Sequence, residues 1–237
     1  MSSEGGTWRD VAGAALRIGA APDAGQVALV SGGDEGVGSQ LVRWLSALGM
    51  RVVLGCRSVE HGRLMIDRFG PLADRVVVRR LDVTDANSVE RLVAWVTGQL
   101  GRCDVLVCNL TLRLDESHGR IDLEAVRDEL WTQVRGIRQL AHAVAPMMRA
   151  CGYGRVVTVR AGDFVPVGSD VAAHRMTRSA IDALTRSLPE ELGCAGILAN
   201  AYCPQRDDIG GATPSAVETP LWLATLPDDG PTGHVYG

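Results

Sequence analysis

Short runs of consecutive apolar residues alternate along the chain with longer stretches in which apolar residues recur every three or four positions. Continuous Val, Leu and Ile runs are typical of parallel strands buried on both faces, and the longer spacing predicts helices that cover the sheet. The alternation therefore predicts one α/β domain with a doubly wound parallel sheet. The predicted strands are 26–31, 51–56, 75–81, 104–108, 154–160, 195–203 and 234–236, and the predicted helices are 37–49, 59–69, 87–100, 123–149, 171–192 and 215–226.

Residues 1–24 precede this alternation as an N-terminal extension to a domain that spans residues 25–237. Apolar residues recur in the extension at roughly helical spacing, but glycines and Pro22 interrupt them. We favour a partly ordered arm. The alternative is a lid over a substrate or a partner protein.

Composition limits the partners and the chemistry. A formal net charge of −4 gives no reason to expect nucleic acid or anionic membranes as partners. The six cysteines are scattered without a Cys-x-x-Cys pair, which fits a reduced cytoplasmic protein without a structural metal. Charged residues interrupt every long apolar stretch, and no basic segment precedes an apolar core near Met1, so we expect neither a transmembrane helix nor a signal peptide. All 24 basic residues are arginine, so no lysine amine can take part in catalysis.

A glycine-rich segment, Ser31-Gly-Gly-Asp-Glu-Gly-Val-Gly38, lies between the first predicted strand and the first predicted helix. Glycines at these spacings permit a tight turn and a close approach of the backbone to a pyrophosphate at the helix N-terminus. Because the strand–turn–helix context is present, the segment predicts a dinucleotide site that includes Gly32, Gly36 and Gly38.

Four further motifs follow along the chain. They are Leu81-Asp82-Val83, Asp104-Val-Leu-Val-Cys-Asn109, Asn200-Ala-Tyr-Cys-Pro204 and Glu218-Thr-Pro-Leu-Trp-Leu-Ala-Thr-Leu-Pro227. With the glycine segment, they resemble the short-chain dehydrogenase/reductase superfamily over residues 26–237, and the last motif resembles its carbonyl-reductase subgroup. The resemblance implies a Rossmann-type fold with a seven-stranded parallel sheet and a small-molecule substrate. It also implies a homodimer or homotetramer that assembles through the helices 123–149 and 171–192.

By this resemblance NADP is the expected cofactor, and Arg57, Asp82 and Asn109 join the glycines in the predicted cofactor site. Arg57 stands where NADP-preferring relatives place an arginine on the 2′-phosphate. Those relatives usually carry Lys or Arg before the second glycine of the loop, whereas this chain has Glu35 beside Asp34. Carboxylates repel a phosphate, and Glu35 could instead pair with Arg57 and occupy it. We therefore expect weakened NADP binding, or no bound cofactor.

The side chains with which this family reduces a carbonyl are replaced. The resemblance places the catalytic Ser at Ala161, the Tyr at His174, the Lys at Arg178 and the supporting Asn at Gln133. In the family the Tyr donates a proton to the carbonyl oxygen, and the Lys lowers the pKa of that Tyr and holds the nicotinamide ribose. The Ser polarises the carbonyl, and the Asn supports a water in a proton relay. The nicotinamide side also differs from the family's pattern, because the family's Pro-Gly is replaced by Pro204-Gln205.

The replacements suggest a different use of the same positions. His174 and Arg178 are four residues apart, so both lie on one face of a helix. A neutral His174 beside the cation could act as a base, while Arg178 stabilises an enolate or phenolate oxygen. Asp163, two residues beyond the lost Ser, and Gln133 complete the predicted catalytic set. The alternative is that these residues are remnants packed against their neighbours.

Three functions fit these observations. The favoured one is a non-redox enzyme, such as a cyclase, isomerase or dehydratase, that acts on a hydrophobic carbonyl-bearing metabolite of the kind made in secondary metabolism. The second is an NADPH-dependent carbonyl reductase with His174 as the proton donor. The third is an inactive member of the family that binds nucleotide or a partner subunit. The fold supplies the scaffold in each case and does not choose among them.

Overall fold

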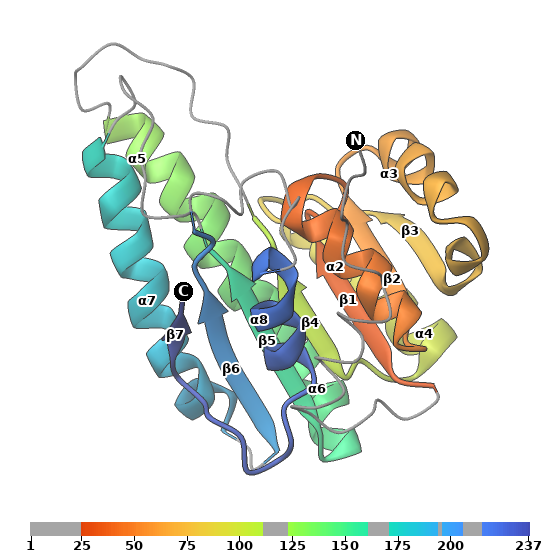
Figure 1. The fold of residues 1–237 in the computed structure, drawn as a ribbon. Coiled ribbons are helices and arrows are strands. Elements are labelled where there is room, and N and C mark those ends of the chain that lie inside the picture. The colour runs from red at the N-terminus through yellow and green to blue at the C-terminus, as the bar shows by residue number, and fades with distance from the viewer. Residues whose placement is uncertain (1–24, 111–122, 161–170, 194–195, 206–214) are drawn as a thin grey trace, which may run out of the picture.

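Seven parallel strands form a single sheet at the centre of the molecule (Figure 1). The computed structural model describes residues 25–110, 123–160, 171–193, 196–205 and 215–237. The strand order β3-β2-β1-β4-β5-β6-β7 confirms the predicted doubly wound parallel sheet. The strands are β1 (Val27–Ser31), β2 (Arg51–Cys56), β3 (Val76–Arg80), β4 (Val105–Cys108), β5 (Gly154–Val159), β6 (Ile197–Tyr202) and β7 (Val235–Tyr236).

Helices cover both faces of the sheet, because the central strands are almost entirely apolar and buried. One hydrophobic cluster joins one face to α2, α3 and α8, and a second cluster joins the opposite face to α4, α6 and α7. Figure 1 shows α2 and α8 in front of the sheet. The helices are α2 (Gly36–Ala47), α3 (Val59–Ile66), α4 (Ala86–Leu100), α5 (Leu123–Leu130), α6 (Gly136–Cys151), α7 (Val171–Leu192) and α8 (Ser215–Ala224).

The direction of winding reverses between β1 and β4. The strands run outward from β1 to β3 on one side and from β4 to β7 on the other. The connections after β1 and β4 therefore diverge at the carboxyl ends of the strands, where open α/β sheets bind their ligands. Gly32 follows β1 and Asn109 follows β4, so both residues lie at this switch point.

The helix predicted over 59–69 ends earlier than expected. The α-helix α3 stops at Ile66, and a 3-10 segment, η1 (Asp67–Arg75), follows it. Gly70 in this segment has a φ of 59°, and Pro71 lacks the N–H that an α-helix would use. The prediction was therefore wrong in its last turn, where the chain kinks.

The single helix predicted over 123–149 is interrupted. Its first part, α5, ends at Leu130, and a π-helical segment, η2 (Trp131–Arg135), joins it to α6, which continues to Cys151. A π turn inserts an extra residue into a helix and is frequently found at functional sites. The three segments together still connect β4 to β5 on one face of the sheet.

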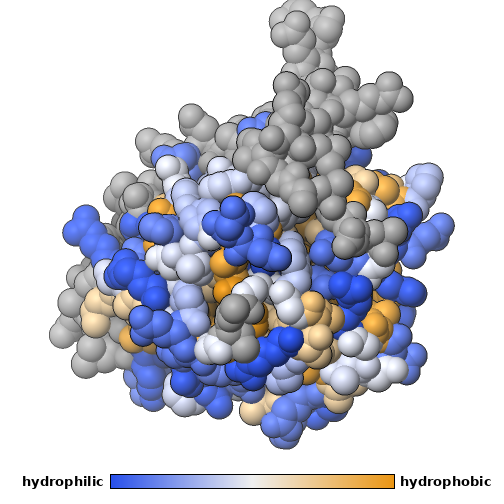
Figure 2. All heavy atoms as spheres, turned by 90° about the horizontal axis from the view of Figure 1, so that it is seen from below, coloured by the Kyte–Doolittle hydropathy of each residue, from blue (hydrophilic) through white to orange (hydrophobic). Residues whose placement is uncertain are grey.

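A buried arginine closes the edge at which the strands begin. Arg155 in β5 donates hydrogen bonds of 2.7 and 2.9 Å to the carbonyl oxygens of Leu226 and Gly196, and one of 2.8 Å to the carboxylate of Asp228. Its guanidinium also lies 3.8 Å from the ring centre of Tyr153. Figure 2, which views the molecule from this side, shows mainly hydrophilic side chains around scattered hydrophobic ones. This edge is held by structural contacts, and the predicted site lies at the opposite edge.

Two expectations concern other parts of the chain. No helix within the described residues is long and apolar enough to cross a membrane. The predicted extension, residues 1–24, lies outside the described residues.

Candidate functional site

The glycine loop after β1 packs directly against the end of β4. Gly32 and Gly36 have φ angles of 63° and 53°, which side-chain-bearing residues rarely adopt. The side-chain amide of Asn109 donates a hydrogen bond of 2.6 Å to the carbonyl oxygen of Gly32. A methyl group on Gly32 would overlap the Asn109 carbonyl, and one on Gly38 would lie 2.5 Å from the Asn109 amide nitrogen. The close packing therefore requires glycine at two of the predicted positions, 32 and 38.

The start of α2 presents its backbone to an anion. Glu35 is the N-cap residue, with extended φ and ψ angles of −142° and 158°, and its side chain makes no capping hydrogen bond. The first turn of α2 contains no acidic residue. The N–H groups of a first helical turn have no partners within the helix, and the helix dipole favours negative charge there. This helix start and the close-packed loop fit the pyrophosphate of a dinucleotide.

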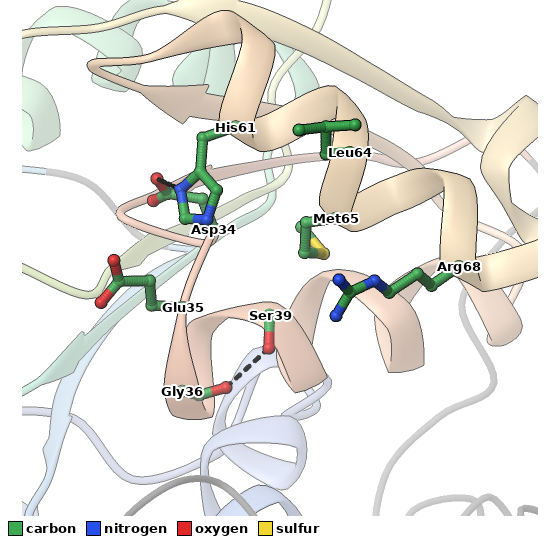
Figure 3. A pocket seen from close by; sticks show the side chains of 8 residues that line it. All are labelled: Asp34, Glu35, Gly36, Ser39, His61, Leu64, Met65 and Arg68. Atoms are coloured by element: carbon green, nitrogen blue, oxygen red, sulfur yellow. Dashed lines mark hydrogen bonds and ion pairs between the residues drawn. The ribbon is translucent and has the colours of Figure 1, made fainter.

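A pocket of about 360 Å³ lies between the loop and α3 (Figure 3). His61 on α3 faces Asp34 in the loop, and its Nδ1 lies 3.2 Å from Oδ2 of Asp34. The pocket is lined by Asp34, Glu35, Gly36, Ser39, His61, Leu64, Met65 and Arg68. It borders the region where the resemblance places the adenosine ribose, so two carboxylates border the expected position of a 2′-phosphate.

Arg57 and Asp82 lie near each other at the carboxyl ends of β2 and β3. The Thr84 hydroxyl donates a hydrogen bond of 2.6 Å to Asp82. This bond holds the pKa of Asp82 below its usual value, and the charge of Arg57 lowers that pKa further. The expected pair between Glu35 and Arg57 is not among the ion pairs found between described residues, where the loop carboxylate of Asp34 pairs with His61 instead. The pairing of Glu35 with Arg57, which the sequence left open, is therefore not supported by the ion pairs of the described residues.

The catalytic end is described in part. Ala161 and Asp163 lie outside the described residues. His174 lies in the first turn of α7, and its side chain is also outside the description. Arg178 follows one turn later and is half-buried. The predicted shared helix is therefore present, and a catalytic role for this pair stays a prediction.

Gln133 lies in the middle of the π turn η2. It is only 3% exposed, and its side-chain amide donates a hydrogen bond of 3.1 Å to the carboxylate of Glu129. Glu129, on α5, is also buried. The irregular turn and a buried carboxylate thus fix the side chain at the position where the resemblance places the supporting Asn. The sequence analysis did not show this, because it expected one regular helix over 123–149.

Beside Arg178, the structure adds two charged residues that the sequence did not single out. Arg160 follows β5 and is buried, and its Nε lies 3.0 Å from Oδ1 of Asp182 on α7. The backbone N–H of Arg160 donates to the carbonyl oxygen of Tyr202 at 2.9 Å, which anchors it to β6. An arginine at the end of an apolar strand was the available signal, together with an aspartate four residues after Arg178.

Cys203 completes this region from the end of β6. Burial raises the pKa of its thiol, while the charges of Arg160 and Arg178 act in the opposite direction. The thiol is therefore kept protonated, and it is not an activated nucleophile. Within the described residues no group of three His, Cys, Asp or Glu side chains is placed to hold a metal ion.

Known proteins resemble the chain in both sequence and fold. Oxidoreductase UcpA of Salmonella typhimurium is 31% identical over 187 residues, which cover 76% of this chain and 68% of that protein. The 3-oxoacyl-[acyl-carrier-protein] reductase FabG of Escherichia coli is 25% identical over 180 residues, which cover 76% and 72%. A short-chain type dehydrogenase/reductase structure from Mycobacterium marinum superposes with a TM-score of 0.78 at 21% identity, over 94% of this chain and 96% of that one.

The relatives in sequence are oxidoreductases, and the structural match is to the fold described above. The family model of the short-chain dehydrogenases matches residues 26–208, a range that includes the glycine loop, Asn109 and the His174–Arg178 pair. The chain therefore belongs to the short-chain dehydrogenase family.

Proposed function

We propose that the protein is a nicotinamide-dinucleotide-dependent reductase of a carbonyl compound. The observation that carries the proposal is the hydrogen bond between Asn109 and Gly32. Gly38 packs so closely against both residues that a side chain at position 38 would not fit. Such packing keeps the backbone at the start of α2 accessible to a pyrophosphate. The oxidoreductase relatives support the same conclusion.

Residues at one end of the site would bind the cofactor, and residues at the other end would act on the carbonyl. The glycine loop and the first turn of α2 would bind the pyrophosphate, and Asp82 and Arg57 would border the adenosine. A bound NADPH supplies the hydride that reduces the carbonyl carbon. In our proposal His174 donates a proton to the carbonyl oxygen, and Arg178 keeps a fixed positive charge where the family has a lysine. The carbonyl thereby gains a hydride and a proton and becomes an alcohol.

A second candidate is acid–base chemistry without hydride transfer, such as a cyclisation, isomerisation or dehydration. The specific observation that favours it is the replacement of all four family positions, by Ala161, His174, Arg178 and Gln133. In this case His174 removes or returns a proton next to a carbonyl, and Arg178 stabilises the resulting enolate. The dinucleotide site would then be inherited from the family without being used for redox chemistry.

One experiment separates these candidates. The purified protein is incubated with NADPH deuterated at C4 and with acetoacetyl-coenzyme A or 9,10-phenanthrenequinone as the probe. Mass spectrometry then follows the transfer of deuterium to the product. Transfer that requires the protein supports the reductase. Binding of NADPH by calorimetry without transfer to either probe would overturn the reductase proposal in favour of acid–base chemistry or of a nucleotide-binding role.

The proposal also covers the substrate class and the oligomeric state. We infer a small-molecule substrate and a homodimer or homotetramer, with α5–α6 and α7 as the interface. Trp131 in η2 and Met176 on α7 are each 53% exposed, which is high for such large apolar side chains. Their neighbouring elements pack side by side in the subunit (Figure 1). A second copy of the chain would bury this surface.

A further inference from the structure

His61 and Asp34 link the first turn of α3 to the glycine loop on one side of the pocket (Figure 3). Nδ1 of His61 lies 3.2 Å from Oδ2 of Asp34, and the two side chains are 50% and 20% exposed. The Arg68 guanidinium lies across the pocket from this pair. His61 is therefore open both to solvent protons and to a ligand in the pocket.

The charge of His61 decides the overall charge of the pocket lining. Asp34 and Glu35 contribute carboxylates, Arg68 contributes a guanidinium, and the rest of the lining, apart from His61, is uncharged. Histidine gains and loses its proton between about pH 5 and 8, whereas arginine keeps its charge. With a neutral His61 the lining is negative overall, and with a protonated His61 the charges balance.

The groups around His61 on the neighbouring elements do not make a similar change. Glu60 precedes it on α3 and lies outside the pocket lining, and Arg57, after β2, keeps its charge. Burial, followed by the charge of Asp34, raises the pKa of the Cys56 thiol to about 11, so this thiol stays protonated. The residues that α2 adds to the lining, a glycine and a serine, carry no charge. Among the side chains that line the pocket, His61 is thus the one whose charge changes near neutral pH.

The pocket borders the region where the ribose of a dinucleotide would lie. The start of α2 would bind the pyrophosphate, and in this type of fold an arginine near the end of the second strand accommodates a 2′-phosphate. Arg57 directly follows β2, and α3 begins two residues later, where the Ser58 hydroxyl accepts a hydrogen bond of 3.2 Å from the N–H of His61. NADPH and NADH differ only in the 2′-phosphate, so the charge of the pocket bears on the choice between them.

We propose that His61 makes the choice of dinucleotide depend on pH. A proton on His61 shifts the preference toward NADPH, and its loss shifts the preference toward NADH, because the carboxylates of Asp34 and Glu35 then repel the 2′-phosphate. A bound phosphate favours the charged imidazole, so NADPH binding takes up a proton. The inference rests on the proposed function for the class of ligand, a nicotinamide dinucleotide, and requires no hydride transfer.

The test compares the affinities of NADPH and NADH by calorimetry from about pH 6.5 to about pH 8.5. The second pKa of a phosphate monoester is about 6, so the 2′-phosphate is mostly a dianion throughout this range. We expect the ratio of NADPH affinity to NADH affinity to fall roughly threefold or more as the pH rises. His61→Gln should lower the ratio at the acidic end and make it nearly independent of pH. His61→Arg should keep the ratio high at every pH.

The matched control is His142→Gln. His142 also pairs with a carboxylate, since its Nε2 lies 3.1 Å from Oε2 of Glu191, but it lies on α6, which packs on the opposite face of the sheet from α3. This variant should keep the pH dependence of the unaltered protein. Calorimetry of NADPH binding in two buffers that differ in ionisation enthalpy measures the proton uptake directly. The uptake should be present in the unaltered protein and absent from His61→Gln and His61→Arg.

Several outcomes would overturn the inference. One is a ratio that does not change with pH in the unaltered protein, and another is a pH dependence that survives His61→Gln. The absence of measurable NADPH binding at about pH 6.5 would overturn it as well, because the pocket is then no phosphate site at the pH that favours a charged histidine. The reductase proposal fails on a different result, which is dinucleotide binding without deuterium transfer.

Discussion

The side-chain amide of Asn109 lies 2.6 Å from the carbonyl oxygen of Gly32 and donates a hydrogen bond to it. This bond joins the end of β4 to the loop after β1. The winding of the sheet reverses between these two strands. The loop hydrogen-bonds the neighbouring strand as well, since the N–H of Gly32 donates to the carbonyl oxygen of Gly55 at 3.0 Å. The conformation of the loop is therefore set from both sides before any ligand binds.

Gly38→Ala should greatly weaken the binding of dinucleotide. Its new methyl group would lie 2.5 Å from both the Asn109 amide nitrogen and the Gly32 oxygen, so the loop would have to move. We expect NADPH affinity in calorimetry to fall by about tenfold or more, which corresponds to ~1.4 kcal/mol. The control is Gly98→Ala on α4, where a methyl group meets open space. That variant should bind NADPH normally and gain roughly 0.5–1 kcal/mol of stability. Unchanged affinity in Gly38→Ala would argue against a pyrophosphate at this loop.

Glu35→Arg should strengthen the binding of NADPH. Glu35 lines the pocket beside Asp34, and replacing its negative charge near a 2′-phosphate is worth about 1 kcal/mol or more. Binding of NADH should change much less, since it lacks the 2′-phosphate. Glu60→Arg makes the same change of charge at an exposed position of α3 outside the pocket lining, so it controls for net charge. Tight NADPH binding by the unaltered protein would show that the acidic loop does not repel the phosphate.

The sequence predicted the sheet well because most strands are short runs rich in apolar residues, as in Val105–Cys108. It predicted less where contacts join distant segments. The Asp34–His61 pair spans 27 residues, and it depends on how α3 approaches the loop. The Arg160–Asp182 ion pair likewise depends on the packing of α7 against β6, the strand beside β5. Of the predicted site, the glycines and Asn109 lie together, whereas the Asp163 position lies outside the described residues.

Arg155→Met should destabilise the fold far more than Asp228→Asn. The buried guanidinium donates to the carbonyl oxygens of Leu226, Gly154 and Gly196 as well as to the Asp228 carboxylate. The Gly196 oxygen keeps the backbone N–H of Gly154 as a donor. Each buried carbonyl that does lose its donor costs about 1–3 kcal/mol, so we expect a loss of about 2 kcal/mol or more in chemical denaturation. The Asp228 side chain is 71% exposed, and its loss should cost less than about 1 kcal/mol. Equal losses in the two variants would mean that the ion pair, and not the carbonyl bonds, holds this edge.

Met176→Asp should disrupt the proposed homodimer or homotetramer. A carboxylate placed on α7 would be buried in the proposed interface without a partner, which opposes association. Leu64→Asp provides the matched control, because Leu64 is 59% exposed but lies on α3, outside the proposed interface. Sedimentation velocity should show a smaller species for Met176→Asp alone. A monomer in the unaltered protein would remove the proposed assembly and leave the fold unaffected.

His174→Ala should remove catalysis while leaving the fold intact. His174 lies in the first turn of α7, a helix that the hydrophobic core holds through later residues such as Ile181 and Leu188. Loss of a general acid lowers a rate by roughly 10²–10⁴-fold, so deuterium transfer from NADPH to the probe that the protein reduces should fall by that factor. The melting temperature and NADPH affinity should stay the same. His234→Ala removes an exposed imidazole elsewhere and should keep full activity.

The double variant His174→Tyr with Arg178→Lys is a second test of this role, because it restores the family's own proton donor. It should recover at least part of the transfer that His174→Ala loses. Full activity in His174→Ala would exclude this histidine as the proton donor, and would leave Arg178 as the only part of the pair with a role in the site.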